Sequence, residues 1–207
     1  MFSHYFFRHF VLFFVTLFIA SCGGGGDSST NNSPPVTSKF ITFNFTANVE
    51  QIGGVPPFPV AIGDKMTGTF VYPLDAIDSN IENVNQGYFY HLESPSGLHF
   101  QLNSVDFTSG QDETLIQTWN DDFSNKMYMV DTFLLYAFSS KYSEMEILFY
   151  MNDLTGTVFT SDTCNSLPHS LSLNSFNSNY IQMQWISPET GGYVWGVRLV
   201  PDSLIKQ

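Results

Sequence analysis

The chain has few cysteines and few basic residues, and both shortages limit what it can do. Cys22 and Cys164 are its only cysteines. Seven lysines and arginines stand against nineteen acids, which gives a formal net charge of −12. Proteins that bind nucleic acid or anionic lipid headgroups through charge normally carry a basic patch. We therefore expect no nucleic-acid partner, and anionic headgroups are poor candidates.

The N-terminal apolar run is too short to cross a membrane. Residues Phe10 to Ala20 are apolar except for Thr16, and Arg8 precedes them. A membrane-spanning helix needs about 18 or more apolar residues, whereas the core of a signal peptide has about 7 to 15. The length predicts an export signal over residues 1–21.

The residues that follow this core carry a recognisable pattern. Ile19-Ala20-Ser21-Cys22 resembles the lipobox of bacterial lipoproteins, in which small residues precede a cysteine. The resemblance implies that Cys22 carries a diacylglyceryl thioether and fatty acyl chains such as palmitate, which hold the protein on a membrane. Because Gly23 is not the aspartate that signals inner-membrane retention in many enteric lipoproteins, it also implies outer-membrane placement. An uncleaved anchor, or a chance cysteine behind an ordinary signal, is the alternative.

Residues 22–38 predict a flexible tether. They contain four consecutive glycines, then serine, threonine, asparagine and two prolines, and almost nothing apolar to bury. A phosphate-binding loop would need a strand before the glycines and a helix after them. Neither is predicted here.

Residues 39–207 are expected to form one all-β domain. In the segment 41–50, apolar and polar residues alternate strictly, which is typical of a strand with one buried face. Similar runs, separated by Gly, Pro, Asn, Asp and Ser, predict about nine strands, at 41–50, 65–73, 87–92, 97–107, 114–119, 126–138, 144–151, 180–186 and 193–200. Many short strands favour a β-sandwich of two packed sheets, with jelly-roll topology as one arrangement.

The order of several motifs resembles a known type of domain. These are "GDKMTGTFVYPLDAIDSN", "GYFYHLESPSGLHFQL", "FYMNDLTGTVFTSDTCNSLPHSL" and "GGYVWGVRLV". They are similar to an uncharacterised β-rich domain of exported bacterial proteins, many of which end in a Pro-Glu-Pro sorting tail. This chain ends "VPDSLIKQ" instead, so the lipid at Cys22 would replace that anchor. The resemblance implies no activity.

Glu144 and Glu146 are candidate catalytic residues. They lie two apart, so on a strand both carboxylates point to the same side. Retaining glycosidases place two carboxyl groups about 5 to 5.5 Å apart, and some jelly-roll enzymes take them from one strand. Where such enzymes have a third acid, this chain has Leu148 and Phe149. The alternative is that the two glutamates lie on a solvated face while their apolar neighbours fill the core.

Asp75, Asp78, Asn80 and Glu82 form an oxygen-rich segment that is a candidate calcium site. Calcium takes six to eight oxygen ligands from such loops, although the spacing typical of an EF-hand is absent. The alternative is a set of solvated turns. Calcium is therefore the only cofactor that the sequence suggests.

Cys164 has no partner for a disulfide if Cys22 is acylated. His169 follows it at a distance of five residues, which allows a Cys-His nucleophile. The competing interpretation is a small buried hydrophobic residue.

The three tryptophans and ten tyrosines also allow a carbohydrate-binding interpretation. Trp185 and Trp195, however, stand in alternating segments that suit a core face.

Altogether the sequence favours a lipid-anchored envelope lipoprotein whose β-domain is a non-catalytic binding or structural module. Its expected partner is a glycan or an envelope protein, and the alternative function is a glycan hydrolase that uses Glu144 and Glu146.

Overall fold

A computed structural model describes Lys39 to Gln207, apart from residues 81, 84, 91, 110–112, 121–130, 140–144, 160–163, 165, 188 and 190–191. All described residues belong to the unit Thr37–Gln207. The predicted signal peptide, Cys22, the whole tether and Glu144 therefore lie outside the described residues.

The described residues form ten β-strands and one short 3-10 turn, η3 (Leu173–Ser175). The strands are β1 (Phe40–Gly54), β2 (Lys65–Pro73), β3 (Gln86–Phe89), β4 (Gly97–Leu102), β5 (Val105–Thr108), β6 (Thr114–Trp119), β7 (Asp131–Phe138), β8 (Met145–Asp153), β9 (Ser178–Ile186) and β10 (Tyr193–Lys206). The all-β class predicted from the sequence is confirmed. Within this described part, no helix is long and apolar enough to cross a membrane.

The strands are hydrogen-bonded into one antiparallel sheet in the order β3-β6-β7-β8-β9-β10-β1-β2-β4-β5. The first and the last strand of the chain are neighbours, because β1 pairs with β10 on one side and with β2 on the other. The sequence led us to expect two separate sheets packed face to face, whereas the structure has one continuous sheet that curls. Alternating apolar residues fill the core in either arrangement, so the pattern does not distinguish them.

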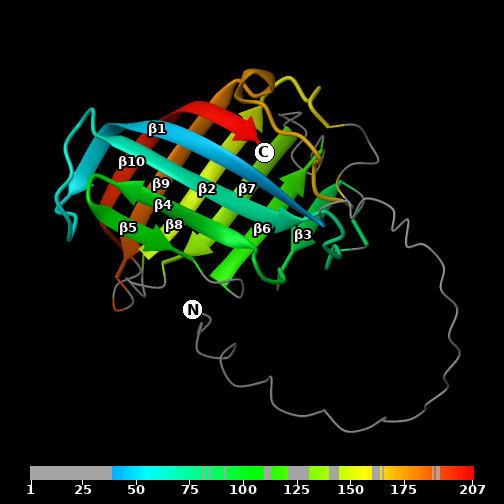
Figure 1. The fold of residues 1–207 in the computed structure, drawn as a ribbon, viewed down its shortest axis with the longest axis horizontal. Helices are drawn as coiled ribbons and strands as arrows, with labels where there is room; N and C mark the ends of the chain where they lie inside the picture. Colours follow the sequence, from blue (N-terminus) through cyan, green and yellow to red (C-terminus); the bar gives the residue numbers. More distant parts are fainter. Residues whose placement is uncertain are drawn as a thin grey trace, which may run out of the picture. The chain divides into compact units, whose positions relative to one another are not determined.

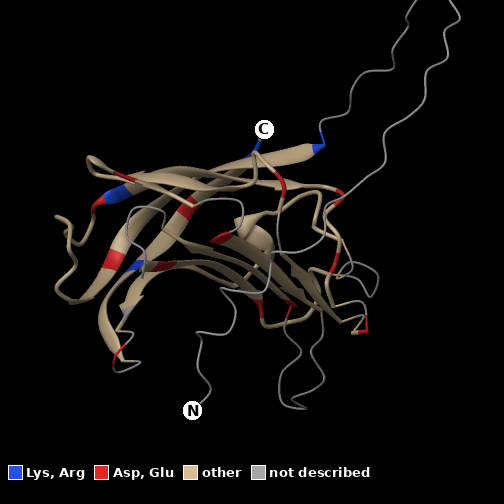
Figure 2. Ribbon diagram, turned by 90° about the horizontal axis from the view of Figure 1, so that it is seen from below, with Lys and Arg blue, Asp and Glu red and all other residues tan. Residues whose placement is uncertain are grey.

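The two halves of the curled sheet pack against each other through aromatic rings. Figure 1 shows β1 and β2 crossing in front of β7 and β8, and Figure 2 shows the two halves one above the other. The ring of Phe45 on β1 meets Phe149 of β8 edge-on, with 5.2 Å between the centroids. Phe70 of β2 lies 6.2 Å from Phe133 of β7. Since these strands are not neighbours in the sheet, the core lies between its two halves.

Strict alternation along each strand supplies this core. The inward residues of β1 are at most 3% exposed: Ile41, Phe43, Phe45, Ala47 and Val49. Between them stand Thr and Asn residues that are partly exposed. Each fully buried Phe contributes roughly 1.5 to 3 kcal/mol. The prediction that the odd-numbered residues of 41–49 face the core is therefore confirmed.

One predicted strand, 97–107, is a hairpin of two strands, which explains why ten strands form rather than nine. The chain reverses after Leu102, and Leu102 pairs with Val105. Asn103 has a φ of +56°, a left-handed conformation that asparagine tolerates better than most residues. The alternation changes phase at this turn, from Leu98, Phe100 and Leu102 to Val105 and Phe107, with Asn103-Ser104 between them. This two-residue polar break is the signal of a tight hairpin turn that the prediction overlooked.

β10 continues to Lys206, although the sequence predicted an end at residue 200. Pro201 lies inside the strand at an irregular point of its pairing with β1, where Ala47 pairs with Pro201 and Thr46 with Ser203. Asp202 is the extra residue of this bulge. A bulge accommodates proline because it removes the need for a ladder N–H at that position.

Candidate functional site

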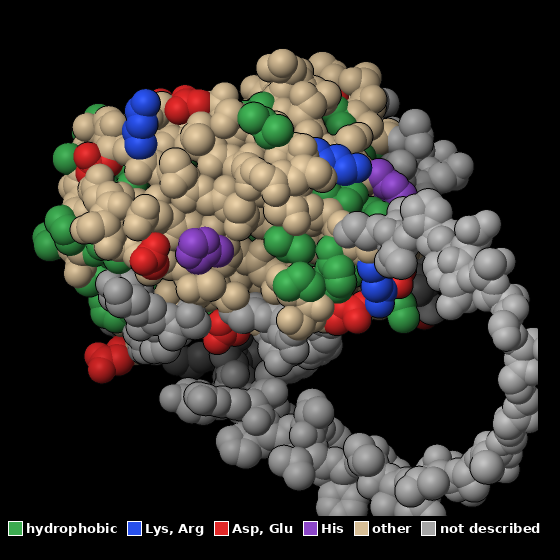
Figure 3. Space-filling view, viewed as in Figure 1, with side chains coloured by type: hydrophobic (Ala, Val, Ile, Leu, Met, Phe, Trp, Pro, Cys, Tyr) green, Lys and Arg blue, Asp and Glu red, His purple; other side chains and the backbone are tan. Residues whose placement is uncertain are grey.

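The two halves of the sheet present different outer faces. Over β1, β2 and β4 the outward side chains are mainly Thr, Asn, Gln and His, as in the row Thr46, Thr67 and Gln101, which are aligned by strand pairing. Figure 3 views this side and shows it mostly free of charged and hydrophobic side chains. This face is polar and nearly uncharged.

The outer face over β6 to β9 carries aromatic rings instead. Leu134, Tyr150 and Tyr180 lie side by side on β7, β8 and β9. The rings of Tyr150 and Tyr180 stack with 5.0 Å between their centroids, and the guanidinium of Arg198 lies 4.6 Å from the centroid of Tyr180. These rings already contact one another and a cation, so they stabilise the sheet across its strands.

Glu146 lies on this aromatic outer face. Its neighbours in β8, Met145 and Ile147, are 1% and 0% exposed, so Glu146 points away from the core. The expectation that its apolar neighbours fill the core is confirmed. The other predicted carboxylate, Glu144, lies outside the described residues, so the geometry of the pair stays a prediction.

Two side chains hold the carboxylate of Glu146. Strand pairing places it between Phe138 of β7 and Gln184 of β9. Gln184 Nε2 donates to Glu146 Oε2 at 2.8 Å, and the hydroxyl of Tyr136 also hydrogen-bonds to Glu146. Burial, followed by this hydrogen bond, the charge of Glu146 and the nearby Tyr193, raises the pKa of Tyr136. The phenol therefore stays protonated and acts as a donor.

Two exposed rings lie on this face: Phe138 is beside the carboxylate on β7, and Tyr193 on β10 is within electrostatic reach of Tyr136. Tyr193 is 73% exposed and Phe138 is 39% exposed. The rings of Phe138 and Tyr136 meet nearly at right angles, with 5.1 Å between centroids. We call Tyr136, Phe138, Glu146, Gln184 and Tyr193 the Glu146 patch.

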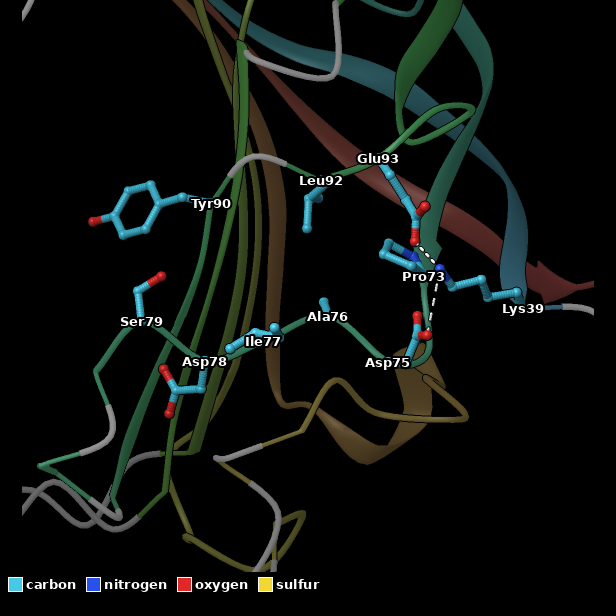
Figure 4. Close-up of a pocket in the computed structure, with 10 residues that line it drawn as sticks. All are labelled: Lys39, Pro73, Asp75, Ala76, Ile77, Asp78, Ser79, Tyr90, Leu92 and Glu93. Carbon is cyan, nitrogen blue, oxygen red and sulfur yellow. Dashed lines mark hydrogen bonds and ion pairs between the residues drawn. The ribbon is translucent and has the colours of Figure 1, made fainter. Parts of the chain in front are cut away.

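A pocket of about 470 Å³ lies between the segment that follows β2 and the segment that follows β3 (Figure 4). Lys39 connects the two walls: its ammonium lies 3.4 Å from Asp75 Oδ2 and also pairs with Glu93. The three side chains are about half exposed. Exposed ion pairs of this kind contribute little to stability, typically below 1 kcal/mol. The carboxylate of Asp75 is thus paired with a lysine and does not form a cation site with Asp78 and Glu82.

Asp78 and Asn80 organise a turn. Asp78 is 6% exposed, and its Oδ1 accepts hydrogen bonds from the backbone N–H groups of Asn80 (2.8 Å) and Tyr88 (2.9 Å). Its Oδ2 is buried and has no hydrogen-bond partner. The side chain of Asn80 donates to the carbonyl of Gln86, and Glu82 is exposed. These contacts are those of a turn, the alternative considered for this segment.

No three His, Cys, Asp or Glu side chains among the described residues are grouped so that they could hold a metal ion. The structure therefore does not bring the predicted calcium ligands together as one set. Calcium binding by this segment has no structural support in the described part of the chain.

Cys164 is a free, fully buried cysteine. Its carbonyl oxygen accepts a hydrogen bond from Thr118 Oγ1 at 3.3 Å, and burial raises the pKa of its thiol to about 11. His169 is exposed. A nucleophilic thiolate needs a lowered pKa and access to solvent, so the interpretation of Cys164 as a small buried residue fits better than that of a nucleophile.

The thiol of Cys164 should react slowly with Ellman's reagent in the folded chain. The raised pKa reduces the thiolate fraction about 100-fold, and burial slows access further. The measurement compares reaction rates with and without urea in the Cys22→Ser chain, which has no other thiol. Equal rates in both conditions would contradict this expectation.

The sequence did not identify four of the five residues of the Glu146 patch. Phe138 and Gln184 were placed in strands but given no role, because only strand pairing makes them neighbours of Glu146. The sequence did contain a usable signal. Polar and aromatic residues alternate with buried apolar residues along these strands, so they stand at the outward positions.

Comparison with known proteins gives no relative from which a function could be transferred. No family model, no curated protein and no solved structure matches this chain.

Proposed function

We propose that this chain is a lipoprotein of the bacterial cell envelope, anchored through Cys22 at the outer membrane, whose β-domain binds a ligand without transforming it. The anchor is supported by the lipobox-like Ile19-Ala20-Ser21-Cys22 behind an apolar core of signal-peptide length. A glycine-rich tether would then separate the lipid from the β-domain.

The binding role is supported by one observation, the Glu146 patch. The rings of the core are buried, as Phe43 and Phe149 are at 0% exposure, and the outer rings Tyr150 and Tyr180 stack on each other, whereas Tyr193 and Phe138 are exposed near a carboxylate held by two donors. Exposed apolar side chains around a few fixed polar groups are characteristic of binding surfaces.

The anchor is tested by metabolic labelling with palmitate. We expect label in the wild-type protein and none in Cys22→Ser, because only the thiol at that position would accept the lipid. Cys164→Ser is the matched control and should be labelled like the wild type, since Cys164 is buried. Equal labelling of Cys22→Ser and the wild type would refute lipid attachment at Cys22.

Binding is distinguished from hydrolysis by the fate of the ligand. Incubation of the protein with a panel of polysaccharides should release no reducing ends. Release that disappears in both Glu144→Gln and Glu146→Gln would replace the binding role by the glycan hydrolase alternative.

A further inference from the structure

The Glu146 patch crosses several strands of one open sheet face. Phe138, Glu146 and Gln184 are aligned on β7, β8 and β9. Neighbouring strands lie about 4.8 Å apart, so this row is about 10 Å across. Tyr136 and Tyr193 border it. The result is an extended surface rather than a closed pocket, which suits a polymer better than a small molecule.

The polar groups of the patch can bind hydroxyl groups. A carboxylate offers about four lone-pair positions, and two donors from the protein leave acceptor capacity on Glu146. Gln184 is 8% exposed and holds the carboxylate through Nε2, so it positions Glu146 for the ligand. Because Gln184 and Tyr136 fix the carboxylate, little side-chain entropy would be lost when a ligand binds.

The aromatic groups of the patch offer flat apolar surfaces. Tyr193, at 73% exposure, has the most accessible ring of the patch, and Phe138 follows at 39%. Flat rings of this kind can pack against the C–H faces of a sugar ring.

Charge favours a neutral ligand. Strands β6 to β9 contain three charged residues, Asp131, Glu146 and Asp153, and the first and last are 0% and 2% exposed. Glu146 is thus the only charged residue of these four strands on their outer face, and the guanidinium of Arg198 from β10 lies over Tyr180 on the same face. Although the chain has a net charge of −12, these four strands present little charge on their outer face. A neutral face does not select a strongly charged partner.

We propose that the Glu146 patch binds a neutral polysaccharide, with sugar rings packed on Tyr193 and Phe138 and sugar hydroxyls bonded to Glu146. This inference rests on the proposed binding role of the β-domain and names the class of its ligand.

The test is a binding isotherm of the full-length protein in detergent on cellulose, chitin and insoluble mannan. At least one of these polymers should retain the wild type, and Tyr193→Ala should weaken that retention at least tenfold. Tyr90→Ala is the matched control, because Tyr90 is a 45% exposed tyrosine that follows β3, outside the patch. It should leave retention within about twofold. Since Tyr193 is exposed, its replacement should leave the melting temperature within about 2 °C.

Each outcome decides one question. No retention on any of the three polymers, or tighter binding to anionic alginate than to all of them, overturns the polysaccharide inference, and the palmitate result for the anchor is unaffected. Equal weakening by Tyr90→Ala and Tyr193→Ala overturns the assignment to the Glu146 patch. Retention together with release of reducing ends would keep the ligand class but refute the proposed binding role.

Discussion

Replacing Gly68 by alanine is expected to destabilise the β-domain by about 3 kcal/mol. A Cβ atom at this position would lie 2.5 Å from Phe100 Cβ, 2.6 Å from Phe45 Cζ and 2.7 Å from the carbonyl oxygen of His99. The carbonyl oxygen and the Cβ atom belong to rigid parts of β4 and cannot rotate away. Overpacking of a well-packed core typically costs 1 to 3 kcal/mol, and three simultaneous clashes place this change at the upper end.

The effect of Gly68→Ala would extend across the core. The ring of Phe45 occupies the space above Gly68 and meets Phe149 of the opposite half of the sheet at 5.2 Å. A methyl group would push this ring toward β8 and disturb the contact between the two halves. The cost therefore includes lost packing as well as the local clash.

Urea denaturation followed by fluorescence measures this loss. The matched control is Gly53→Ala in β1, where the nearest atom to a new Cβ is the carbonyl oxygen of Gly196 at 4.0 Å. This change should alter the free energy of unfolding by less than about 1 kcal/mol, and a small gain is expected because alanine restricts the unfolded chain. Similar losses in both variants would show that close packing at Gly68 is not the cause.

The positions of most strands could be predicted from the sequence, because each strand buries one side. The predicted strands 65–73 and 114–119 match β2 and β6 residue for residue. Alternation is a local property, and burial of one face enforces it whatever the neighbouring strands are. Two predicted strands were wrong for local reasons. The turn at Asn103 divides the strand predicted at 97–107, and the bulge at Pro201 lets β10 continue past residue 200.

The order of the strands could not be predicted in the same way. The strand candidates 87–92 and 97–107 follow each other in the sequence, yet β3 pairs with β6 while β4 pairs with β2 and β5. Likewise, nothing in the alternation indicates that β1 and β10 are neighbours. Pairing depends on contacts between distant segments, which a single sequence does not reveal.

The candidate site depends on this unpredicted level of structure. Glu146 was recognised as a carboxylate on a strand, but its role changes once Gln184 and Phe138 are its neighbours. The sequence offered a pair of glutamates along one strand, whereas the structure surrounds one of them with an amide, a phenol and exposed rings taken from other strands. Side chains that are spread over several strands suit contact with an extended ligand. A pair of glutamates along one strand gave no such indication.

The second large effect is expected at Asp153, at the end of β8. Asp153 is 2% exposed and accepts five hydrogen bonds. The donors are the backbone N–H and hydroxyl groups of Thr155 (2.9 and 2.6 Å) and Thr157 (2.8 and 3.0 Å), and the side-chain amide of Asn177 (3.1 Å). Asp153→Ala would remove the acceptor of all five bonds, which should cost about 2 to 3 kcal/mol at pH 7, because water reaches the exposed Thr155, Thr157 and Asn177 and compensates only in part for the loss.

Acid should reveal the same interaction in the wild type. Burial alone would raise the pKa of Asp153, but the hydrogen bonds from Thr155 and Thr157 outweigh it and lower the pKa from the ordinary value of 3.8 to about 2. A lowered pKa in the folded state means that the contribution is complete above the unfolded value and is lost as the pH falls from about 4 to 2. A shift of this size corresponds to roughly 2 kcal/mol.

The contribution of the Asp153 charge is measured from the free energy of unfolding of the wild type and of Asp153→Ala between pH 7 and pH 2. Other acids titrate in both proteins, so the difference between wild type and Asp153→Ala isolates this carboxylate. We expect that difference to shrink by roughly 2 kcal/mol below pH 4, because the protonated wild type no longer benefits from the charge. Asp106→Ala, a change of an exposed acid in β5, serves as the control and should differ little from the wild type at any pH. A difference for Asp153→Ala that stays constant down to pH 2 would mean that its loss reflects lost packing rather than a carboxylate stabilised by hydrogen bonds.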